Sequence, residues 1–315
     1  MLTNIMVEKL VEPTRVDKYL AAKFPELSRS LISLHCKEKQ VCLKSGKILS
    51  AGDSLHGGEE LCISFNLNPV QASGDKVTGE LPIKIVFQDE YLIVLDKPSG
   101  MPSVTLTAQD PVTVADSLLN FDPSLIEVSE DKRESGLIHR LDTASSGLMV
   151  AARSSLVWQL LREELKSNRI KKSYCCLVGG TSSYSNYSST LFLGAKGKKV
   201  KIADNNFPES VETYSKLSTK WSGNFSNKKL SVVNVEAPFA KRHQVRAHLS
   251  YLEHPLVGDS LYGSNLKLNE IFKDAKQEFI LHANSLGFTH PIERAEMEFQ
   301  SENELLDTVF ASEKK

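Results

Sequence analysis

The chain carries no excess of positive charge, because its 38 Lys and Arg residues are balanced by 39 Asp and Glu residues, for a formal net charge of −1. Overall charge therefore gives no attraction to nucleic acid, and any cationic surface has to be local. The N-terminus carries Glu8, Lys9 and Glu12 where a secretory signal needs an unbroken apolar segment, and no later apolar run could span a bilayer. We expect a cytoplasmic protein that does not contact a membrane.

Cysteines are few and lack the spacings that hold metal ions. The chain has five, without CxxC spacing and without a downstream HxxxH partner set. Neither a GxGxxG nor a Walker sequence occurs. We expect structural thiols, with a zinc site as the alternative, and an activity that needs no metal and no cofactor. The cysteines are Cys36, Cys42, Cys62, Cys175 and Cys176.

A length of 315 residues allows a large domain and a small one, and a small N-terminal domain is indicated by two helix starts. Thr14 is predicted to cap the first helix, with Asp17 three residues later in the place of the capping-box acid. Ser28 is predicted to cap a second helix that ends near Lys39. Short strands are expected to follow over residues 41–65.

A linker is predicted next, because residues 66–80 collect Pro, Gly, Ser and Asp without a periodic apolar signal. We therefore expect a first domain over residues 13–66, a linker over 67–81 and a second domain over 82–310.

The second domain alternates strand-like runs with helical patterns, which predicts a mixed α+β fold. One helix is expected over residues 155–167 behind a Ser155 cap, with Leu156, Leu160, Leu161 and Leu165 on one face. Residues 182–189 and 266–277 are expected to be surface insertions. The predicted strands are Ile83–Phe87, Tyr91–Leu95, Leu148–Ala152, Lys172–Val178, Val211–Leu217 and Leu230–Val235.

Two short clusters of polar residues adjoin predicted strands. "GLIHRLDTASSGLMV" places His139, Arg140 and Asp142 just before an apolar run, and "KKSYCCLV" places Lys172 and Tyr174 at the start of another. Taken singly, Asp142 is more simply a turn carboxylate and His139 a hydrogen-bonding structural residue.

A third cluster, "KRHQVRAHLSYLEHPLVGDSLYG", runs from residue 241 to 263. Read as a helix, it places Val245, Leu249 and Leu252 on one face and His243, Arg246 and Ser250 on another. The pattern predicts an amphipathic helix whose cationic side either faces solvent or belongs to a site.

Together these clusters resemble the motifs of the RluA family of pseudouridine synthases, for which HRLD followed by small residues and Gly is the catalytic signature. "LDKPSG" resembles the KPxG turn of that family, and "RHQVRAHL", "HPLVGDSLYG" and "LHANSLGFTHP" continue the match in order. The resemblance implies an α+β fold, in which a mixed, mostly antiparallel sheet with flanking helices forms the catalytic domain.

The resemblance also implies an activity, which is the isomerisation of uridine to pseudouridine in structured RNA after the base has flipped out of its stack. It assigns Asp142 as the nucleophile, which suits a side chain that is already ionised at neutral pH. It pairs Arg246 with that aspartate, and a guanidinium can hold carboxylate oxygens in a bidentate fork. It assigns Tyr174 to stack on the uracil, with a lesser role in proton removal.

The same resemblance gives candidate RNA contacts. Arg140 is expected to fill the place that the flipped base leaves, and His139 to brace the loop. The remaining candidates in the second domain are Lys172, Lys241, Arg242, His243 and Gln244.

The N-terminal domain, with "TRVDKYLAAKFPELSRS" and a later "AGD", resembles the S4 RNA-binding module, a small α/β unit. Arg15, Arg29 and Lys37 are candidates for a local phosphate-binding patch.

We therefore expect a monomeric RNA pseudouridine synthase that acts on large-subunit (23S) ribosomal RNA. The alternatives are the same chemistry on transfer RNA, and a non-catalytic RNA-binding factor for ribosome assembly.

Overall fold

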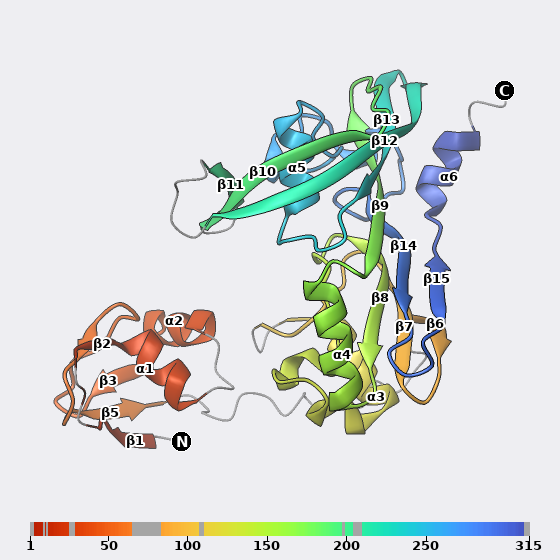
Figure 1. Cartoon of the computed structure of the whole chain (residues 1–315). Helices are drawn as coiled ribbons and strands as arrows, with labels where there is room; N and C mark the ends of the chain where they lie inside the picture. The colour runs from red at the N-terminus through yellow and green to blue at the C-terminus, as the bar shows by residue number, and fades with distance from the viewer. Residues whose placement is uncertain are drawn as a thin grey trace. The chain divides into compact units, whose positions relative to one another are not determined.

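The structure, a computed structural model, describes residues 3–8, 10, 12–24, 29–64, 83–106, 110–196, 199–203 and 210–311. Contacts divide the chain into two units, residues 1–77 with 105–110 and residues 78–104 with 111–315. Each unit has its own apolar core and is described by itself (Figure 1). The predicted linker over 67–81 lies outside the described residues.

The first unit combines two helices with two small antiparallel sheets. One sheet has three strands in the order β1-β5-β3, and the other pairs β2 with β4. Ile5 of β1 is buried in the core of this unit, so the unit begins before residue 13. The elements are β1 (Thr3–Met6), β2 (Thr14–Arg15), α1 (Val16–Lys23), α2 (Arg29–Lys37), β3 (Val41–Leu43), β4 (Ser54–Leu55) and β5 (Glu60–Ile63).

The predicted capping box at the first helix is wrong. Thr14 lies in β2, its hydroxyl donates to the carbonyl of Glu12, and Arg15 takes the cap position without a side-chain hydrogen bond. Asp17 instead forms an ion pair with Arg15, at 3.0 Å. Pairing with β4 takes the backbone of Thr14 out of the cap. The expected cap Ser28 lies outside the described residues.

The second unit is built on one sheet. Its strands are β6 (Lys84–Gln88), β7 (Leu92–Lys97), β8 (Ser146–Ala152), β9 (Lys171–Gly179), β10 (Tyr187–Lys196), β11 (Lys199–Ala203), β12 (Val211–Phe225), β13 (Lys228–Glu236), β14 (Leu281–Thr289) and β15 (Glu296–Gln300). They form a ten-stranded sheet in the order β11-β10-β12-β13-β9-β14-β8-β7-β6, with β15 beside β14. Every pairing is antiparallel except that of β14 with β8. The predicted α+β class with a mostly antiparallel sheet is confirmed.

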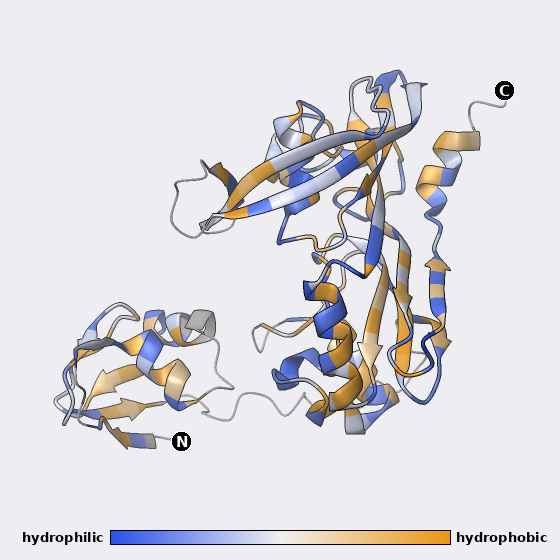
Figure 2. Cartoon of the chain, in the orientation of Figure 1, coloured by the Kyte–Doolittle hydropathy of each residue, from blue (hydrophilic) through white to orange (hydrophobic). Residues whose placement is uncertain are grey.

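The apolar pattern of each strand agrees with its burial. β7 and β8 are apolar along most of their length, whereas β15 alternates between polar and apolar residues (Figure 2). β7 and β8 are accordingly buried on both faces, and β15 lies at an edge with one face covered. This explains why the sequence pattern alone located β7 and β8, whereas β15 was not predicted.

Four helices and four short 3-10 turns complete the second unit. They are α3 (Val114–Phe121), η1 (Pro123–Glu127), η2 (Lys132–Glu134), α4 (Ser155–Lys166), α5 (Gln244–Tyr251), η3 (Ser260–Tyr262), η4 (Leu268–Glu270) and α6 (Glu304–Ala311). Among the described residues, no helix has the length and apolar character that a membrane crossing requires.

The N-cap of helix α4 lies one residue earlier than predicted, at Ser154. The hydroxyl of Ser154, rather than that of Ser155, accepts a hydrogen bond from the Val157 amide. Trp158 is buried with Val157, whereas Leu156 is exposed. The apolar face predicted from the leucines is therefore wrong at Leu156.

The two stretches predicted to be surface insertions are partly integrated into the fold. Residues 182–189 lead into β10, and Ser189 is buried beside His248. Residues 266–277 carry Ile271 and Phe272, which pack in an apolar cluster with α6. The prediction holds for residues 183–188, most of which are exposed, but the end of this first stretch, from Tyr187 on, belongs to β10.

Helix α5 does not present a solvated cationic face. Its residues from Gln244 to Leu249 are all buried, and the helix contacts β10, β11 and β12 as well as η3. The side that was predicted to be polar is covered by Asp259 and Tyr262, which contact Arg246, His243 and Ser250. The sheet packs against the opposite side of the helix, through Gln244 and His248. Figure 1 shows α5 beside β10 and β12.

Two glycines near α5 provide a matched pair for a stability test. Gly258 and Gly263 both have φ of +95°, but a Cβ on Gly258 would overlap the carbonyl oxygen of Glu278, whereas a Cβ on Gly263 would meet nothing within 4 Å. We expect Gly263→Ala to lose about 1–2 kcal/mol through backbone strain alone, and Gly258→Ala to lose clearly more. Thermal melting of both variants measures this difference, and equal Tm values would contradict the close approach at Gly258.

Candidate active site

The loop that carries Asp142 is held by the segment that follows β7. The hydroxyl of Ser103 accepts a hydrogen bond from the Leu141 amide at 3.0 Å and donates one to the Leu141 carbonyl at 2.8 Å. The Gly100 amide donates to the carbonyl of Thr143 at 2.8 Å. The backbone on both sides of Asp142 is therefore fixed, while its carboxylate keeps 26% of its surface exposed.

Lys97, at the end of β7, also binds the Asp142 loop. In the sequence it belongs to the KPxG turn, and no role was predicted for it. Its fully buried ammonium donates to the carbonyls of Pro98, Met101 and Thr143, at 3.0, 2.7 and 3.2 Å. Burial lowers the pKa of Lys97 to about 8, although the negative charge of Asp142 raises it. Lys97 is thus a buried cation that is solvated by the segment after β7 and by one carbonyl of the Asp142 loop.

Arg246 joins two carboxylates. Its Nη1 donates to Asp142 Oδ2 at 3.1 Å, and its Nε and Nη2 donate to the two oxygens of Asp259 at 2.7 and 2.8 Å. The bidentate fork predicted for Asp142 is therefore made with Asp259. Burial lowers the pKa of Arg246, and its hydrogen bonds and charge interactions with both aspartates raise it by more. The guanidinium is always charged at this position.

Aromatic rings cover both faces of this guanidinium. Its central carbon lies 5.0 Å from the ring centre of Tyr262 and 4.7 Å from that of Phe279. Asp259 is 0% exposed, and its carboxylate also accepts a hydrogen bond from the Tyr262 amide. Stacking and hydrogen bonding fix the orientation of Arg246, so that its Nη1 group is directed at Asp142.

Asp259 and Tyr262 are the functional residues that sequence reasoning missed. Both lie within "HPLVGDSLYG", which was singled out as a family motif but not given a role. The signal that could have found Asp259 is the need of a buried arginine for a full carboxylate partner.

Tyr174 lies close to the aspartate. Its side chain is buried on β9, and burial together with the charge of Asp142 raises the pKa of its phenol. Tyr174 is therefore protonated at neutral pH, so its hydroxyl can donate a hydrogen bond. The stacking role predicted for its ring stays a prediction.

His243 lies beside the aspartate rather than on an open surface. It has a left-handed backbone, with φ of +56°, directly before α5. Its Nε2 is 3.8 Å from Asp142 Oδ2, and its Nδ1 is 3.1 Å from the hydroxyl of Tyr262. Burial lowers the pKa of His243 below its usual 6.5, although Asp142 raises it. The imidazole is therefore mostly neutral at pH 7 and can exchange a proton close to Asp142.

The other predicted RNA contacts fall into two groups. Arg140, Arg242 and Lys37 are exposed, and Lys241 is half-buried with its ammonium 3.6 Å from the ring centre of Phe239. Arg15 is half-exposed in its ion pair, and the side chain of Arg29 lies outside the described residues.

Gln244, His139 and Lys172 are buried. The amide of Gln244 donates to the carbonyl of Tyr214 at 2.7 Å and accepts from the Lys241 amide. This side chain fixes the start of α5 against β12, so we no longer expect it to contact RNA.

The structure adds no sign of a metal ligand set. All five cysteines are free thiols, and the described residues contain no group of three or more His, Cys, Asp or Glu that could hold a metal ion. The alternative of a zinc site gains no support.

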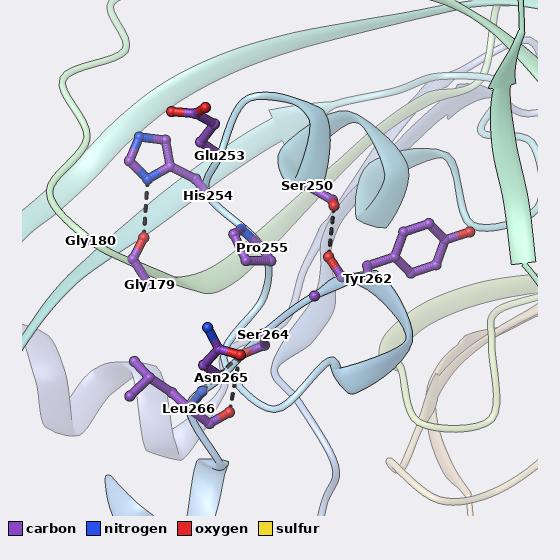
Figure 3. Close-up of a pocket in the computed structure, with 11 residues that line it drawn as sticks. Gly179, Gly180, Ser250, Glu253, His254, Pro255, Tyr262, Ser264, Asn265 and Leu266 are labelled. Carbon is purple, nitrogen blue, oxygen red and sulfur yellow. Dashed lines mark hydrogen bonds between the residues drawn. The ribbon is translucent and has the colours of Figure 1, made fainter.

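A separate cavity of about 500 Å³ borders Tyr262 (Figure 3). His254, Asn265 and Ser250 line the cavity, and the Nδ1 of His254 is hydrogen-bonded to the carbonyl of Gly179. Asp142, Tyr174 and Arg246 do not line this cavity. The chemistry therefore belongs to the Asp142 cluster rather than to this hollow.

Comparison with known proteins places the Asp142 cluster in one family. The model of the family described as RNA pseudouridylate synthase matches residues 91–251, which include the Asp142 loop, Tyr174 and Arg246. The ribosomal large subunit pseudouridine synthase D of Xylella fastidiosa is 28% identical over 285 residues, which are 88% of this chain and 82% of the relative. The protein of the same name from Pseudomonas aeruginosa is 27% identical over 296 residues, which are 91% and 88% of the two chains.

Solved structures share the fold. Human RNA pseudouridylate synthase domain containing 1 superposes with a TM-score of 0.56 at 20% identity, over 73% of this chain and 88% of that chain. Human RNA pseudouridylate synthase domain containing 4 gives a TM-score of 0.52 at 18% identity, over 70% and 88%. At these identities the likeness concerns the fold alone.

Proposed function

Because the chain belongs to the RNA pseudouridylate synthase family, and is thus an enzyme that converts uridine to pseudouridine in RNA, we propose that its substrate is large-subunit ribosomal RNA. The proposal is supported by relatives that carry this substrate in their names and that match over most of both chains. We propose further that the enzyme acts as a monomer in the cytoplasm, where ribosomal RNA is assembled into subunits.

The single observation that carries the mechanism is an aspartate, Asp142, whose side chain is 26% exposed while buried cations hold its loop and one of its oxygens. In the reaction, the N1–C1′ bond of uridine breaks, a C5–C1′ bond forms, C5 loses a proton and N1 gains one. Asp142 acts as the nucleophile, because an ionised carboxylate needs no base to activate it. Arg246 holds Oδ2 of Asp142 at 3.1 Å and leaves the other oxygen for the ribose.

Protons have to move near the same carboxylate. Tyr174 is protonated at neutral pH because its pKa is raised, which favours a role in covering and hydrogen-bonding the uracil over a role as a base. His243 is neutral and has Nε2 3.8 Å from Asp142, so its imidazole is the better acceptor for the proton that leaves C5.

RNA binding in this proposal uses the exposed cations. Arg140 is two residues from Asp142 and exposed, which suits a side chain that takes the place of the flipped base. The first unit acts as an S4-like RNA-binding module, supported by its two helices and small sheets and by the exposed Lys37.

Asp142→Asn tests the nucleophile. The variant keeps the size of the side chain but loses its charge and nearly all its nucleophilicity, so we expect turnover to fall to background while RNA affinity stays within about threefold. Arg246 keeps Asp259 as its partner, so the variant should remain folded. Asp274→Asn, the same change at an exposed position, is the control. Near wild-type pseudouridine formation by folded Asp142→Asn in a single-turnover assay would contradict this mechanism.

Mapping pseudouridine in cellular RNA tests the substrate. Chemical mapping across ribosomal and transfer RNA, with and without the gene, should show one or a few positions of the large-subunit RNA that lose pseudouridine. Restoring the gene should restore them, and the Asp142→Asn gene should not. Loss confined to transfer RNA would overturn the substrate assignment but leave the chemistry intact.

A further inference from the structure

Lys172 is buried next to the active site. Only 6% of its surface is exposed, and it stands two residues before Tyr174 on β9. Side chains two residues apart on a strand point to the same face and are about 7 Å apart. Lys172 therefore points to the face of the sheet on which Tyr174 adjoins Asp142.

The ammonium of Lys172 has no partner of opposite charge. Within the described part of the chain, no hydrogen bond or ion pair holds it, in contrast to Lys97, whose ammonium meets three carbonyls. Burial alone lowers the pKa of Lys172 to about 8, and no acid contributes to raising it. Lys172 is still mostly charged at pH 7, and no contact among the described residues offsets the cost of its partial removal from water.

His139 shares these surroundings. It is 7% exposed, and among the described residues neither of its ring nitrogens has a hydrogen-bond partner. Burial lowers the pKa of His139 well below 6.5, and the nearby charges of Lys172 and Arg162 lower it further. A neutral imidazole carries one N–H, so His139 offers one donor beside the ammonium.

The acids of this region face other cations. Glu134 has charge interactions with Arg162 and Arg140, and Asp131 accepts hydrogen bonds from Arg133. Neither carboxylate contributes to the pKa of Lys172 or His139. A buried cation and a buried donor thus lie together without an acceptor from the described residues.

We propose that Lys172 and His139 form a binding site for one backbone phosphate of the RNA, next to the uridine that Asp142 attacks. The proposal rests on the proposed function only in requiring RNA as the ligand. Lys172 supplies a full positive charge and His139 a directed hydrogen bond, which together suit a phosphodiester anion.

The position of the pair favours a phosphate over the uracil itself. Asp142 has to meet the ribose C1′, and Tyr174 adjoins Asp142. The target nucleoside therefore lies beside Tyr174 on β9. Lys172 lies about 7 Å from Tyr174, toward the start of the strand and on the same face. The phosphate of a flanking nucleotide can reach this position. A net positive cluster also matches a full negative charge better than a neutral carbonyl.

Lys172→Met tests the site, with Lys171→Met as its control, because Lys171 is the exposed neighbour and both changes remove one charge. We expect Lys172→Met to weaken binding of a large-subunit ribosomal RNA fragment about tenfold or more. It should also flatten the dependence of log Kd on log salt by about 0.7–0.9, the value of one phosphate contact. Lys171→Met should change both quantities much less.

The melting temperature of the free protein is an independent readout. Met removes a largely buried charge that no group of the described residues compensates, so Lys172→Met should melt no lower than wild type, and by expectation several degrees higher. Weaker RNA binding by a more stable protein distinguishes a ligand site from a structural lysine. A lower melting temperature together with unchanged binding would overturn the proposal.

A neutral phosphate identifies the contact. Once the target uridine is mapped, RNAs carry a methylphosphonate at the junction on its 5′ or its 3′ side, with 2′-O-methylation to protect that junction. One substitution should weaken wild-type binding about as much as Lys172→Met does and have no further effect on Lys172→Met. If both substitutions weaken the two proteins equally, Lys172 does not contact either phosphate and the proposal is wrong.

The outcomes also separate this site from the proposed function. If wild type leaves every large-subunit uridine unchanged but Lys172→Met and Lys171→Met still differ in RNA affinity, the substrate assignment fails and the phosphate site stands. If wild type modifies the RNA and the two variants bind alike, the phosphate site fails and the function stands.

Discussion

The buried ion pair between Asp259 and Arg246 is the interaction on which the active site depends. Asp259 is 0% exposed, and its two oxygens take the Nε and Nη2 of the arginine at 2.7 and 2.8 Å. A buried guanidinium without such a partner would be strongly destabilising. Because this fork takes Nε and Nη2, and because Tyr262 and Phe279 pack against the guanidinium, the Nη1 group is left to meet Asp142. The direction of the nucleophile is thus set by a carboxylate that does not itself face the site.

A second buried cation reaches the same loop from the other side. Lys97 binds the carbonyl of Thr143, next to the nucleophile, and its pKa is lowered by burial but raised by the charge of Asp142. Asp142 therefore feels two fixed positive charges, of Arg246 and Lys97, while part of its side chain stays open to a substrate. Such a preorganised arrangement can stabilise developing charge without rearrangement during the reaction. Lys172 differs from Lys97, because no group of the described residues solvates it, and for this reason we assign it to RNA.

The sequence predicted Asp142, Tyr174 and Arg246 as site residues, and the structure brings them together, but the residues that hold them were not predicted. Strands such as β7 and β8 were predictable because their apolar runs reflect burial on both faces. The pairing of Arg246 with Asp142, 104 residues apart, followed only from motif resemblance, since charged residues that pair in the interior leave no periodic pattern. Asp259 looks like a turn residue in sequence, and the start of β10 looks like a loop because Tyr187, Ser188 and Ser189 continue a run rich in serine and tyrosine. Both depend on long-range packing around α5, which local pattern does not encode.

The most direct test of this account is the single-turnover rate of pseudouridine formation by Asp259→Asn on the RNA that wild type modifies. The amide cannot hold both Nε and Nη2 as the carboxylate does, so Arg246 should turn and Asp142 should lose its alignment. A misplacement of about 1 Å can cost about 10²-fold in rate. We predict a fall of this order with little change in RNA affinity, in protein that thermal melting shows to be folded at the assay temperature. A wild-type rate in the folded variant would contradict the claim that Asp259 sets the orientation of the nucleophile.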